Sequence, residues 1–590
     1  MTEAEPKRKK LKSSILSDTI STEDFQSLFR THWQTPTALE APNLEVITNP
    51  FRVCKISNFL SSQDYLGELI DELLYLETTR PETDLYSFEQ TEDLANVDTG
   101  KIAQLHELFR NELRHWMQTN TGIELNTKIS MSSTAYSDTD YLLCHDDHLG
   151  DRRIAFILYL SKDWDAEDGG SLDLFDTDSC GQPRNIIRSL APEYNSLVFF
   201  EVSDNTYHQV AEVTSPDKRR LTVNGWFHGP VGPDTRLPRP EIETPKLHEP
   251  SAIAESLISS WVRKCYLAES IKTGIQEEVE KQSFTYLTNF LEEDVYNKIS
   301  AEIMSEKIKW IRMGPPDTRS YEVADEESLP STLKKMYEMF KSIEMFGLLK
   351  EYTELDLVPD GKDIRPKMTI QLQRWTKGCY TLLSDKGDQN YTASDEQADR
   401  NGTNSKNYER SEEDLVRGET QHEEVNKLGK KKTLEGENGK FLEVNNRRIE
   451  EDQPNSSTAN DDEGEERVLS LDSDDIQGSH ASTNGEGNGD EDDDIYDESG
   501  TLDVIMQFNT SGVPEDATID YVDPMEPDGA FIHVPPEDNH LCLVYRTSDT
   551  SRVHKYVNHY CEGYFYNLVC SYLEKESNVV ISRKETKNVD

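Results

Sequence analysis

The stretch LLCHDDHLG, residues 142–150, places two histidines and two aspartates directly after an apolar pair. Imidazole and carboxylate groups are costly to bury beside a hydrophobic strand unless a partner satisfies them. In an extended segment residues i and i+2 face the same way, so His145 and Asp147 are expected to project together, with Asp146 pointing elsewhere. A neutral imidazole and a carboxylate can fill two positions on a divalent metal.

A third ligand has to come from elsewhere in the chain, and His208 in NTYHQV supplies it, just after the apolar run NSLVFFEV. Two histidines and one carboxylate on one face of Fe(II) leave positions open for substrate and dioxygen, and the absence of clustered cysteines argues against structural zinc. The HxD triplet alone is weak, because most such triplets lie in surface loops and an isolated histidine is more often a core residue. We interpret His148 as a solvated loop residue and Cys144 as a small buried residue beside the site, with thiolate ligation as the minor alternative.

Arg220 lies twelve residues after His208 and opens the apolar segment RLTVNGWF. Two-residue alternation places Arg220, Thr222 and Asn224 on one face of that strand. An arginine on the inner face of a sandwich needs an anion, and its planar guanidinium binds a carboxylate through two hydrogen bonds, beside which Thr222 can add a hydroxyl. The alternative is an arginine at a strand end that faces water.

Two helices are expected ahead of the strands, and Ser61 or Ser62 can cap the first of them. From residue 129 onward, short apolar runs are separated by Gly, Pro, Asn and Asp, which favours a sandwich or jelly roll backed by helices. The apolar residues at helical spacing are Leu66, Ile70, Leu73 and Leu74 in the first helix, and Ile102, Leu105, Phe109, Leu113 and Trp116 in the second.

The second half of the chain repeats short stretches of the first half in the same order. The later stretches, each given with its earlier counterpart, are LTNFL at 287–291 (ISNFL), CYTLLSDK at 379–386 (DYLLCHDD), EPDGAFIHV at 526–534 (EDGGSLDLF) and NHLCLVYR at 539–546 (NSLVFFEV). Chance rarely preserves such an order, so we infer two copies of one fold.

An acidic segment interrupts the second copy. It holds 34 acidic and 13 basic residues, a net charge of −21, and cannot bury enough apolar surface to offset the entropy of ordering, so disorder is expected. The expected parts of the chain are a disordered lead at 1–45, the first copy at 46–232, a proline-rich linker at 233–252, the second copy at 253–384 and 501–580, and the acidic insert at 385–500.

The composition narrows the function classes. The net charge of −51 over 590 residues repels phosphate backbones, so direct nucleic-acid binding is not expected. Eight cysteines without a CxxC pair are typical of a reducing compartment, and no apolar run approaches the roughly 18 residues of a membrane span. The basic run KRKKLK at 7–12 favours nuclear import over a plain solvated tail, so nucleus and cytoplasm are the expected locations.

An HxD pair, a distal histidine and an arginine twelve residues beyond it resemble the Fe(II)- and 2-oxoglutarate-dependent oxygenases. The stretches LLCHDD, RRIAFILYL, GGSLDLF, NSLVFFEVS, HQV and GWFHGP resemble more narrowly the prolyl hydroxylases that modify a ribosomal small-subunit protein. The resemblance is strong over 45–232, looser over 250–384 and 500–575, and absent in the acidic insert. It implies an α+β chain of two double-stranded β-helix (jelly-roll) domains backed by helices, of which only the first is catalytic.

The resemblance also implies roles for the residues described above. His145, Asp147 and His208 would ligate iron as the metal and catalytic residues. Iron would be chelated by 2-oxoglutarate, whose distal carboxylate would bind Arg220 beside Thr222.

Tyr136 and Tyr159 match cosubstrate-contacting tyrosines of relatives, although aromatic residues in strands usually belong to the core. Trp226 is expected to pack against the floor of the site. Dioxygen and L-ascorbate are the other small molecules implied, and the reaction converts 2-oxoglutarate to succinate while a prolyl ring carbon gains a hydroxyl.

The second copy is expected to be non-catalytic. Matching YLLCHDD with YTLLSDK places Ser384 and Lys386 at the positions of the first two ligands. Sliding the match by one residue places Asp385 and Gly387 there, and neither register restores HxD.

The third ligand and the arginine are also missing from the second copy. His559 is expected roughly at the position of the third ligand, but the residue twelve positions later is Ser571. We interpret His554 and His559 as ordinary strand histidines.

The function implied is hydroxylation of a proline in a small-subunit ribosomal protein, with an effect on translation. A basic ribosomal protein is attracted to this acidic chain, and a proline loop is extended enough to reach iron, so action on the free protein before assembly is expected. Two alternatives remain open. One is an oxygen-sensing interaction protein whose second copy binds a partner; the other is a nucleic-acid dealkylating oxygenase, against which the charge argues.

Overall fold

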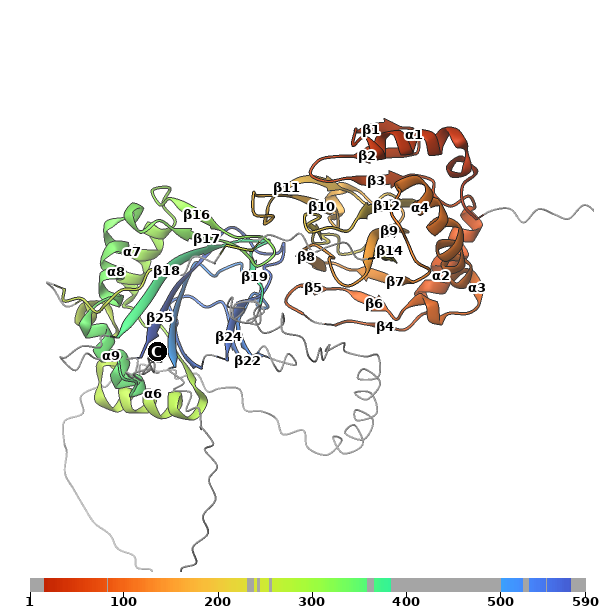
Figure 1. The fold of residues 1–590 in the computed structure, drawn as a ribbon. Coiled ribbons are helices and arrows are strands. Elements are labelled where there is room, and N and C mark those ends of the chain that lie inside the picture. The colour runs from red at the N-terminus through yellow and green to blue at the C-terminus, as the bar shows by residue number, and fades with distance from the viewer. Residues whose placement is uncertain are drawn as a thin grey trace, which may run out of the picture. The chain divides into compact units, whose positions relative to one another are not determined.

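The computed structural model describes residues 15–81, 83–230, 238–240, 245–253, 257–357, 366–383, 500–523, 530–547 and 549–574. Helices and strands are both present and strands predominate, which agrees in coarse terms with the expected fold class (Figure 1). Each half of the chain contains one large and one small antiparallel sheet. The predicted disorder of the insert falls on residues 385–499, which lie outside the described residues.

The first half is built on a nine-stranded sheet whose central strands are almost entirely buried. Such strands read as continuous apolar runs because both faces are covered. In spatial order they are β1 (Leu39–Ala41), β2 (Leu44–Ile47), β3 (Val53–Ile56), β12 (Ser196–Glu201), β9 (Arg152–Tyr159), β14 (Arg220–His228), β7 (Ile129–Tyr136), β6 (Glu89–Thr91) and β4 (Thr78–Thr79).

A five-stranded sheet packs on one face of this large sheet. Phe200 of β12 contributes to the apolar core between the two sheets, together with Leu172 and Leu174 of the small sheet. The small sheet carries the residues of chemical interest. Its strands, in spatial order, are β11 (Pro183–Leu190), β10 (Leu172–Thr177), β13 (His208–Val210), β8 (Tyr141–His145) and β5 (Tyr86–Ser87).

Helices cover the other face of the nine-stranded sheet (Figure 1). Phe199 of β12 points into this helix-covered core while its neighbour Phe200 points between the sheets, as strand alternation requires. The second predicted helix is confirmed, since all five of its apolar residues are buried. The helical segments are α1 (Glu23–Gln34), α2 (Gln63–Leu74), α3 (Gly100–Leu108), a π-helical turn (Phe109–Leu113), α4 (Arg114–Thr121) and the short 3-10 turns Asp18–Ser21, Leu94–Asn96 and Ala166–Asp168.

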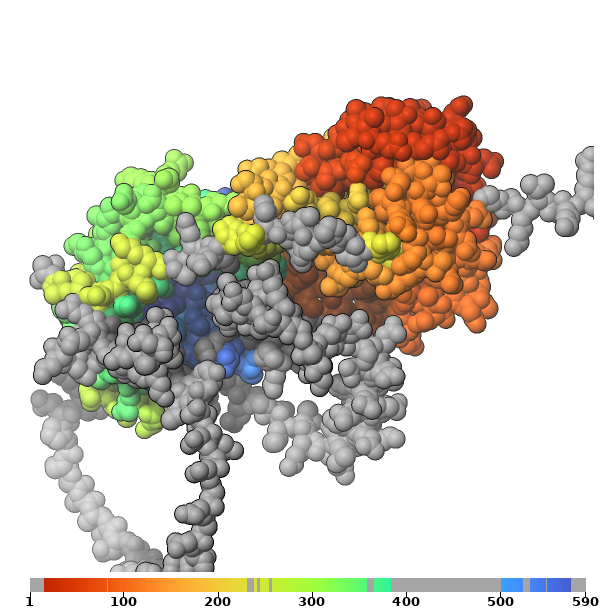
Figure 2. All heavy atoms as spheres, viewed as in Figure 1, coloured from red at the N-terminus to blue at the C-terminus, as the bar shows by residue number. Residues whose placement is uncertain are grey.

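The expectation of a disordered lead over residues 1–45 is wrong for its described part. Thr22 caps α1 by accepting a hydrogen bond from a backbone N–H, and Phe25, Phe29 and Trp33 lie buried on one face of that helix. Figure 2 shows the atoms of this segment, in dark red, packed directly against the orange atoms of the following helices. Three aromatic residues at helical spacing bury enough apolar surface to order a short helix.

The first predicted helix is α2, and its cap is Ser62, whose side chain accepts from the backbone N–H of Tyr65 at 3.2 Å. Leu66 and Leu73 are buried as predicted. Leu74 is 59% exposed, because the buried face runs through Leu69 instead.

The second half contains an eight-stranded sheet and a three-stranded sheet, again with helices on the outer face of the large sheet. The large sheet comprises β15 (Phe284–Leu287), β23 (Leu541–Arg546), β20 (Thr501–Phe508), β25 (Phe565–Leu573), β18 (Lys367–Trp375), β17 (Arg319–Ala324) and β16 (Trp310–Met313), with β19 (Tyr380–Thr381) paired to β17. The small sheet comprises β22 (Ala530–Val534), β21 (Ile519–Val522) and β24 (Ser551–His554). The helices are α5 (Ile258–Trp261), α6 (Glu269–Gln282), α7 (Glu293–Ile303), α8 (Ser331–Phe340), α9 (Ile343–Thr353) and the 3-10 turns Lys264–Leu267 and Glu326–Ser328.

The two large sheets share one strand order. The order β3-β12-β9-β14-β7-β6 in the first half becomes β15-β23-β20-β25-β18-β17 in the second. Asn195 and Asn539 occupy the same place in each half, both with positive φ, and their side-chain amides bond the backbone of Leu60 and Leu291 in the same way. The inferred repeat therefore extends to individual hydrogen bonds.

One part of the repeat was matched wrongly. EDGGSLDLF was paired with residues 526–534, but its strand β10 lies next to β13, and the strand in the equivalent place beside β24 is β21. The true counterpart is therefore EDATIDYVD at 515–523, which contains β21.

The expected linker at 233–252 is only partly described. Between His228, the end of β14, and Ile258, the start of α5, residues 245–253 lie against the second half, where His248 bridges to Met368. Within the part of the chain that the structure describes, none of the helices is long and apolar enough to cross a membrane.

Candidate active site

Two neighbouring strands of the small sheet bring the two predicted histidines together. β13 pairs antiparallel with β8, and the pairing sets His208 directly opposite His145, with ring centroids 4.3 Å apart. β13 also pairs with β10, where His208 lies opposite Leu174. His208 is thus placed by two strands at once and is 5% exposed.

Asp147 completes the group, but not by strand alternation. β8 ends at His145, and Asp147 adopts a left-handed conformation with φ of 60°, which aspartate tolerates better than most residues. Its carboxylate lies 3.6 Å from His145 Nε2 and 3.5 Å from His208 Nε2. The prediction that His145 and Asp147 project together is right, whereas the reason given for it is wrong.

Of three neighbouring residues in or beside the HxD loop, two behave as expected and one only in part. Asp146 points elsewhere, since its side chain accepts from the backbone N–H of His148 at 3.0 Å. His148 is partly exposed, as expected for a loop residue, but it also pairs with Asp204 at 2.6 Å. Cys144 is buried, as expected, and burial raises the pKa of its thiol well above the usual value.

Both imidazoles are oriented for metal binding. His145 Nδ1 lies 2.8 Å from the carbonyl oxygen of Leu143, and His208 Nδ1 lies 2.9 Å from that of Thr206. A carbonyl can only accept, so each Nδ1 carries the proton and each Nε2 keeps its lone pair. The three ligand atoms lie within 4.8 Å of one another, which is a donor set that fits one divalent cation.

Electrostatics keep this donor set in its ligating form. Burial, with repulsion from His145, lowers the pKa of His208 to about 4, so its imidazole is neutral near pH 7. Burial opposes ionisation of Asp147, but the two histidines, Trp226 and Arg152 outweigh it and hold the pKa of this carboxyl below its usual value. Trp226 is part of the wall as predicted, with the Arg152 guanidinium 3.6 Å above its ring.

Arg220 is buried on the inner face of β14, with 1% of its surface exposed. Its Nε donates to the carbonyl of Gly170 at 2.7 Å and its Nη2 lies 3.5 Å from the hydroxyl of Tyr159. Within the described ranges, Arg220 has no carboxylate within ion-pair distance. A buried guanidinium without a counter-ion is a strong site for an anionic ligand.

The other three predicted cosubstrate residues surround Arg220. The guanidinium lies 5.0 Å from the ring of Tyr136 and 5.1 Å from that of Tyr159, and both tyrosines are buried. Thr222 is 1% exposed, and its hydroxyl bonds Thr134 at 2.7 Å within the sheet.

Gly170 is a functional residue that the sequence analysis missed. It has a φ of +64°, and an added Cβ would lie 2.8 Å from Arg220 Cδ and 3.2 Å from Val213 Cγ2. Only glycine allows the backbone carbonyl to approach the arginine so closely. The paired glycines of EDGGSLDLF were the available signal.

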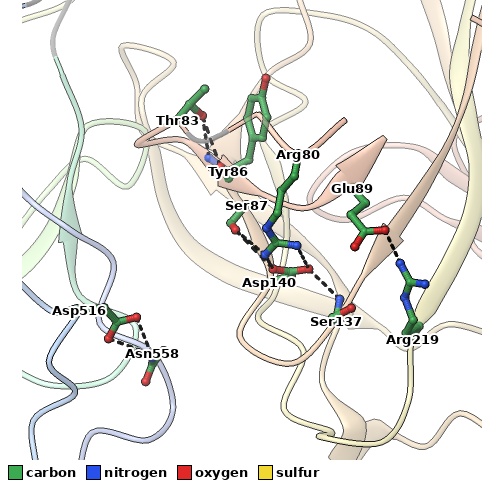
Figure 3. A network of polar contacts seen from close by, with 10 residues as sticks. All are labelled: Arg80, Thr83, Tyr86, Ser87, Glu89, Ser137, Asp140, Arg219, Asp516 and Asn558. Carbon is green, nitrogen blue, oxygen red and sulfur yellow. Dashed lines mark hydrogen bonds and ion pairs between the residues drawn. The ribbon is translucent and has the colours of Figure 1, made fainter. Parts of the chain in front are cut away.

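A buried carboxylate fixes the turn that leads into β8 (Figure 3). Asp140 is fully buried and accepts from the backbone N–H of Ser137 at 2.8 Å, from Ser87 Oγ at 3.3 Å and from the guanidinium of Arg80. This network joins the end of β7, which carries Tyr136, to the start of β8. It was not predicted, because its members lie far apart in the sequence.

The strand pairing of the second half overturns one predicted equivalence. His208 pairs with Leu174, and the residue in the matching place is Arg552, which pairs with Tyr521. His559 does not occupy that place, because β24 ends at His554.

The arginine position of the second half is apolar. Arg220 pairs with Tyr136, and the equivalent pair is Phe565 with Trp375. Ser384, Asp385, Lys386 and Gly387, expected at the other two ligand positions, lie outside the described residues.

Two family models match the chain. The 2OG-Fe(II) oxygenase superfamily matches residues 131–228, and the model described as "Oxoglutarate and iron-dependent oxygenase degradation C-term" matches residues 254–579. The first range contains all three members of the donor set and Arg220. With the geometry above, these matches support Fe(II) and 2-oxoglutarate as the cofactors.

Several curated proteins are similar to this chain. The prolyl 3-hydroxylase OGFOD1 of Mus musculus is 40% identical over 355 residues, 60% of this chain and 64% of that protein. The prolyl 3-hydroxylase OGFOD1 of Xenopus laevis is 35% identical over 365 residues, 57% of this chain and 70% of that protein. The prolyl 3-hydroxylase sudestada1 of Drosophila melanogaster is 33% identical over 356 residues, 58% of this chain and 65% of that protein.

The alignments with the mouse and fly proteins thus span slightly less than two thirds of those relatives. The fold and site define an iron- and oxoglutarate-dependent oxygenase. The chain belongs to the family of the OGFOD1-type prolyl 3-hydroxylases.

Proposed function

We propose that this chain is an Fe(II)- and 2-oxoglutarate-dependent prolyl hydroxylase that adds oxygen to C3 of a proline in a protein substrate. The observation that carries the proposal is Arg220, a buried guanidinium without a carboxylate partner among the described residues, in the same pair of sheets as a His–Asp–His donor set. The names of the related prolyl 3-hydroxylases support the choice of carbon.

The roles of the donor set follow from its chemistry. His145, Asp147 and His208 would hold the iron, because each offers one ligand atom toward the others. Arg220 would bind the distal carboxylate of 2-oxoglutarate by charge-assisted hydrogen bonding.

The hydroxyls of Tyr136, Tyr159 and Thr222 complete the polar wall near that carboxylate. Burial raises the pKa of both tyrosines, so they remain neutral donors.

When bound, iron and 2-oxoglutarate supply the oxidising chemistry, using dioxygen, and L-ascorbate maintains the reduced metal. The protein's own contribution is positional. The carbonyls of Leu143 and Thr206 fix both imidazole tautomers, and the Trp226 ring, capped by Arg152, shields one side of Asp147 from water.

We further propose that both halves are double-stranded β-helix domains and that the second is non-catalytic. The shared strand order supports the first statement. Arg552 and Phe565 at the positions of a metal ligand and of the cosubstrate arginine support the second, because a guanidinium ligates no metal and a phenyl ring binds no carboxylate.

The proposed substrate is a small-subunit ribosomal protein, modified before assembly, in the nucleus and cytoplasm. The net charge of −51 supports long-range attraction to a basic protein and disfavours approach to ribosomal RNA. A proline loop suits the site because proline fixes φ and keeps its predecessor out of a helix. The alternative roles, oxygen-sensing scaffold and nucleic-acid dealkylase, gain no specific support from the site.

Mass spectrometry tests this proposal. Purified enzyme is incubated with Fe(II), 2-oxoglutarate and L-ascorbate, and with either free ribosomal protein or intact small subunits. We expect one added oxygen, about 16 Da, on proline in the free protein only. Equal labelling of intact subunits would contradict the order of events, and succinate formation without labelling of either would contradict the substrate.

A further inference from the structure

The second half contains a cavity of about 210 Å³ at the place where the first half has its metal and cosubstrate residues. Trp375, in the position of Tyr136, and Arg552, in the position of His208, both line it. Its volume equals that of roughly seven water molecules, enough for a small organic molecule.

A histidine at this cavity has a buried acceptor that nothing satisfies. His554 is 4% exposed, and its Nδ1 lies 3.0 Å from the carbonyl of Lys555, so Nδ1 carries the proton. Its Nε2 has no hydrogen-bond partner among the described residues. Burial lowers the pKa of His554 to about 4, which leaves Nε2 a lone-pair acceptor near pH 7.

Aromatic packing fixes the direction of that acceptor. The His554 ring stacks on Trp375, with ring centroids 3.8 Å apart and an interplanar angle of 15°. Trp375 stacks in turn on Tyr321, with ring centroids 4.7 Å apart and an interplanar angle of 9°. Phe565, which replaces the cosubstrate arginine, lies 5.8 Å from His554. The imidazole therefore cannot rotate to find a partner of its own.

A cation lines the same cavity as this acceptor. Arg319 pairs across the sheet with Thr381, and the hydroxyl of Thr381 accepts the backbone N–H of His554 at 2.7 Å, so the three are consecutive neighbours on the cavity wall. Arg319 Nε donates to the carbonyl of Gly314, but within the described part of the chain the guanidinium has no carboxylate at ion-pair distance.

The remaining charges leave this wall positive. Arg552 and Arg546 share the single buried carboxylate of Asp503, at 2.7 and 3.0 Å. The nearest acidic groups on the same strands are engaged elsewhere, Glu322 by Arg374.

Asp520 is likewise engaged, by His533 at 2.9 Å and Lys555 at 3.4 Å. The cavity thus offers positive charge for an anion and, on the same lining, an acceptor for a hydroxyl.

We propose that this cavity binds a small carboxylate that also carries a hydroxyl group, with Arg319 holding the carboxylate and His554 Nε2 accepting from the hydroxyl. The site is separate from the proposed hydroxylation site and contributes none of its residues. It is a ligand site in a domain that has lost the metal chemistry.

Isothermal titration calorimetry on the full-length, metal-free chain tests the proposal, with L-malate and succinate as probes because they differ only in one hydroxyl. Arg220→Ala is used as the parent, so that the first half cannot hold a dicarboxylate. We expect one malate site, at least tenfold weaker in Arg319→Ala, because a charge-assisted pair is lost. Lys334→Ala, which removes an exposed charge of α8, is the matched control and leaves affinity unchanged.

The hydroxyl contact is tested by a cycle of ligand and protein changes. Succinate should bind the parent about fivefold more weakly than malate, and His554→Phe should bind both equally, because each change removes the same hydrogen bond. Absence of malate binding in the parent overturns the proposal, as does full affinity in Arg319→Ala. A malate preference that persists in His554→Phe refutes the assigned acceptor.

A second measurement requires no variant at His554. In the chain with ¹⁵N-labelled histidine, the Nε2 resonance of His554 should shift on addition of malate and stay in place with succinate. Equal shifts with both ligands would contradict the hydroxyl contact.

Discussion

Each half of this chain holds an arginine between an equivalent pair of sheets, Arg220 fully buried and Arg552 partly buried, and the two differ in their partners. Arg220 of the first half has no carboxylate partner within the described residues, whereas Arg552 of the second is neutralised by Asp503, which is itself fully buried. An arginine paired with a carboxylate stabilises the fold, and a buried arginine without one favours binding of an anion. The comparison therefore supports the proposal that only the first half is catalytic.

The same comparison explains why the repeat is so well kept elsewhere. Asn195 and Asn539 make identical backbone contacts, because both halves need the same turn before the same strand. Positions that serve the fold are shared, and positions that serve the chemistry differ.

The largest effect is expected when a proposed metal ligand of the first half is removed. His208→Ala should reduce prolyl hydroxylation below detection, because two remaining ligands hold iron poorly. His533→Ala, at an exposed histidine of the second half's small sheet, should leave turnover unchanged. Hydroxylated peptide is measured by mass spectrometry, and normal turnover in His208→Ala would remove this residue from the site.

The next effect tests the unpaired arginine. Arg220→Ala should raise the KM for 2-oxoglutarate about tenfold or more, because a charge-assisted pair contributes about 1.5–3 kcal/mol. Its neighbour Arg219 is exposed and pairs with Glu89, so Arg219→Ala is the matched control with an unchanged KM. Equal changes in both variants would mean that the effect is general charge rather than a carboxylate contact.

A smaller effect tests the backbone under that arginine. Gly170→Ala places a methyl group 2.8 Å from Arg220 Cδ, so it should raise the KM for 2-oxoglutarate several-fold and reduce stability by about 1–2 kcal/mol. Gly122 also has a positive φ, of +79°, but open space around it, so Gly122→Ala should lose stability without a change in KM. Kinetics and urea unfolding on both variants separate steric displacement from backbone strain.

The smallest effect concerns stability alone, in the second half. The folded-state pKa of His554, lowered by burial to about 4, lies below the unfolded value near 6.5. The contribution of the neutral imidazole to the free energy of unfolding is therefore complete above pH 6.5 and is lost as pH falls toward 4. His554→Phe should reduce the loss of unfolding free energy between pH 6.5 and pH 4 by up to about 3 kcal/mol, with no change in hydroxylation at pH 7. Urea unfolding at several pH values measures it, and an unchanged pH slope would place the titration elsewhere.

Much of the site was predictable because its members lie in short, readable motifs. The chemistry of HxD, a distal histidine and a strand-opening arginine specifies ligand types, and strand alternation correctly placed Arg220 and Thr222 inward. The turn that brings Asp147 to the histidines was not predictable, since a left-handed aspartate leaves no pattern in the sequence.

The parts of the fold that could not be predicted depend on pairing between strands that are distant in the sequence. The counterpart of β10 was placed at 526–534 instead of 515–523, and that of His208 at His559 instead of Arg552, because register depends on hydrogen bonds between strands. The helix near residue 30 was missed because its aromatic residues are stabilised by packing against residues distant in the sequence, Trp116 of α4 and Phe199 of β12.

Arg220, which has no carboxylate partner among the described residues, also links the stability of the fold to the binding of an anion. A buried charge without a counter-ion destabilises the empty fold, and a bound dicarboxylate relieves that cost, so occupancy shifts the folding equilibrium by mass action. Chaperones and proteases act on the unfolded fraction. Cellular abundance of the chain will therefore follow the supply of its cosubstrate, even where the catalytic rate does not.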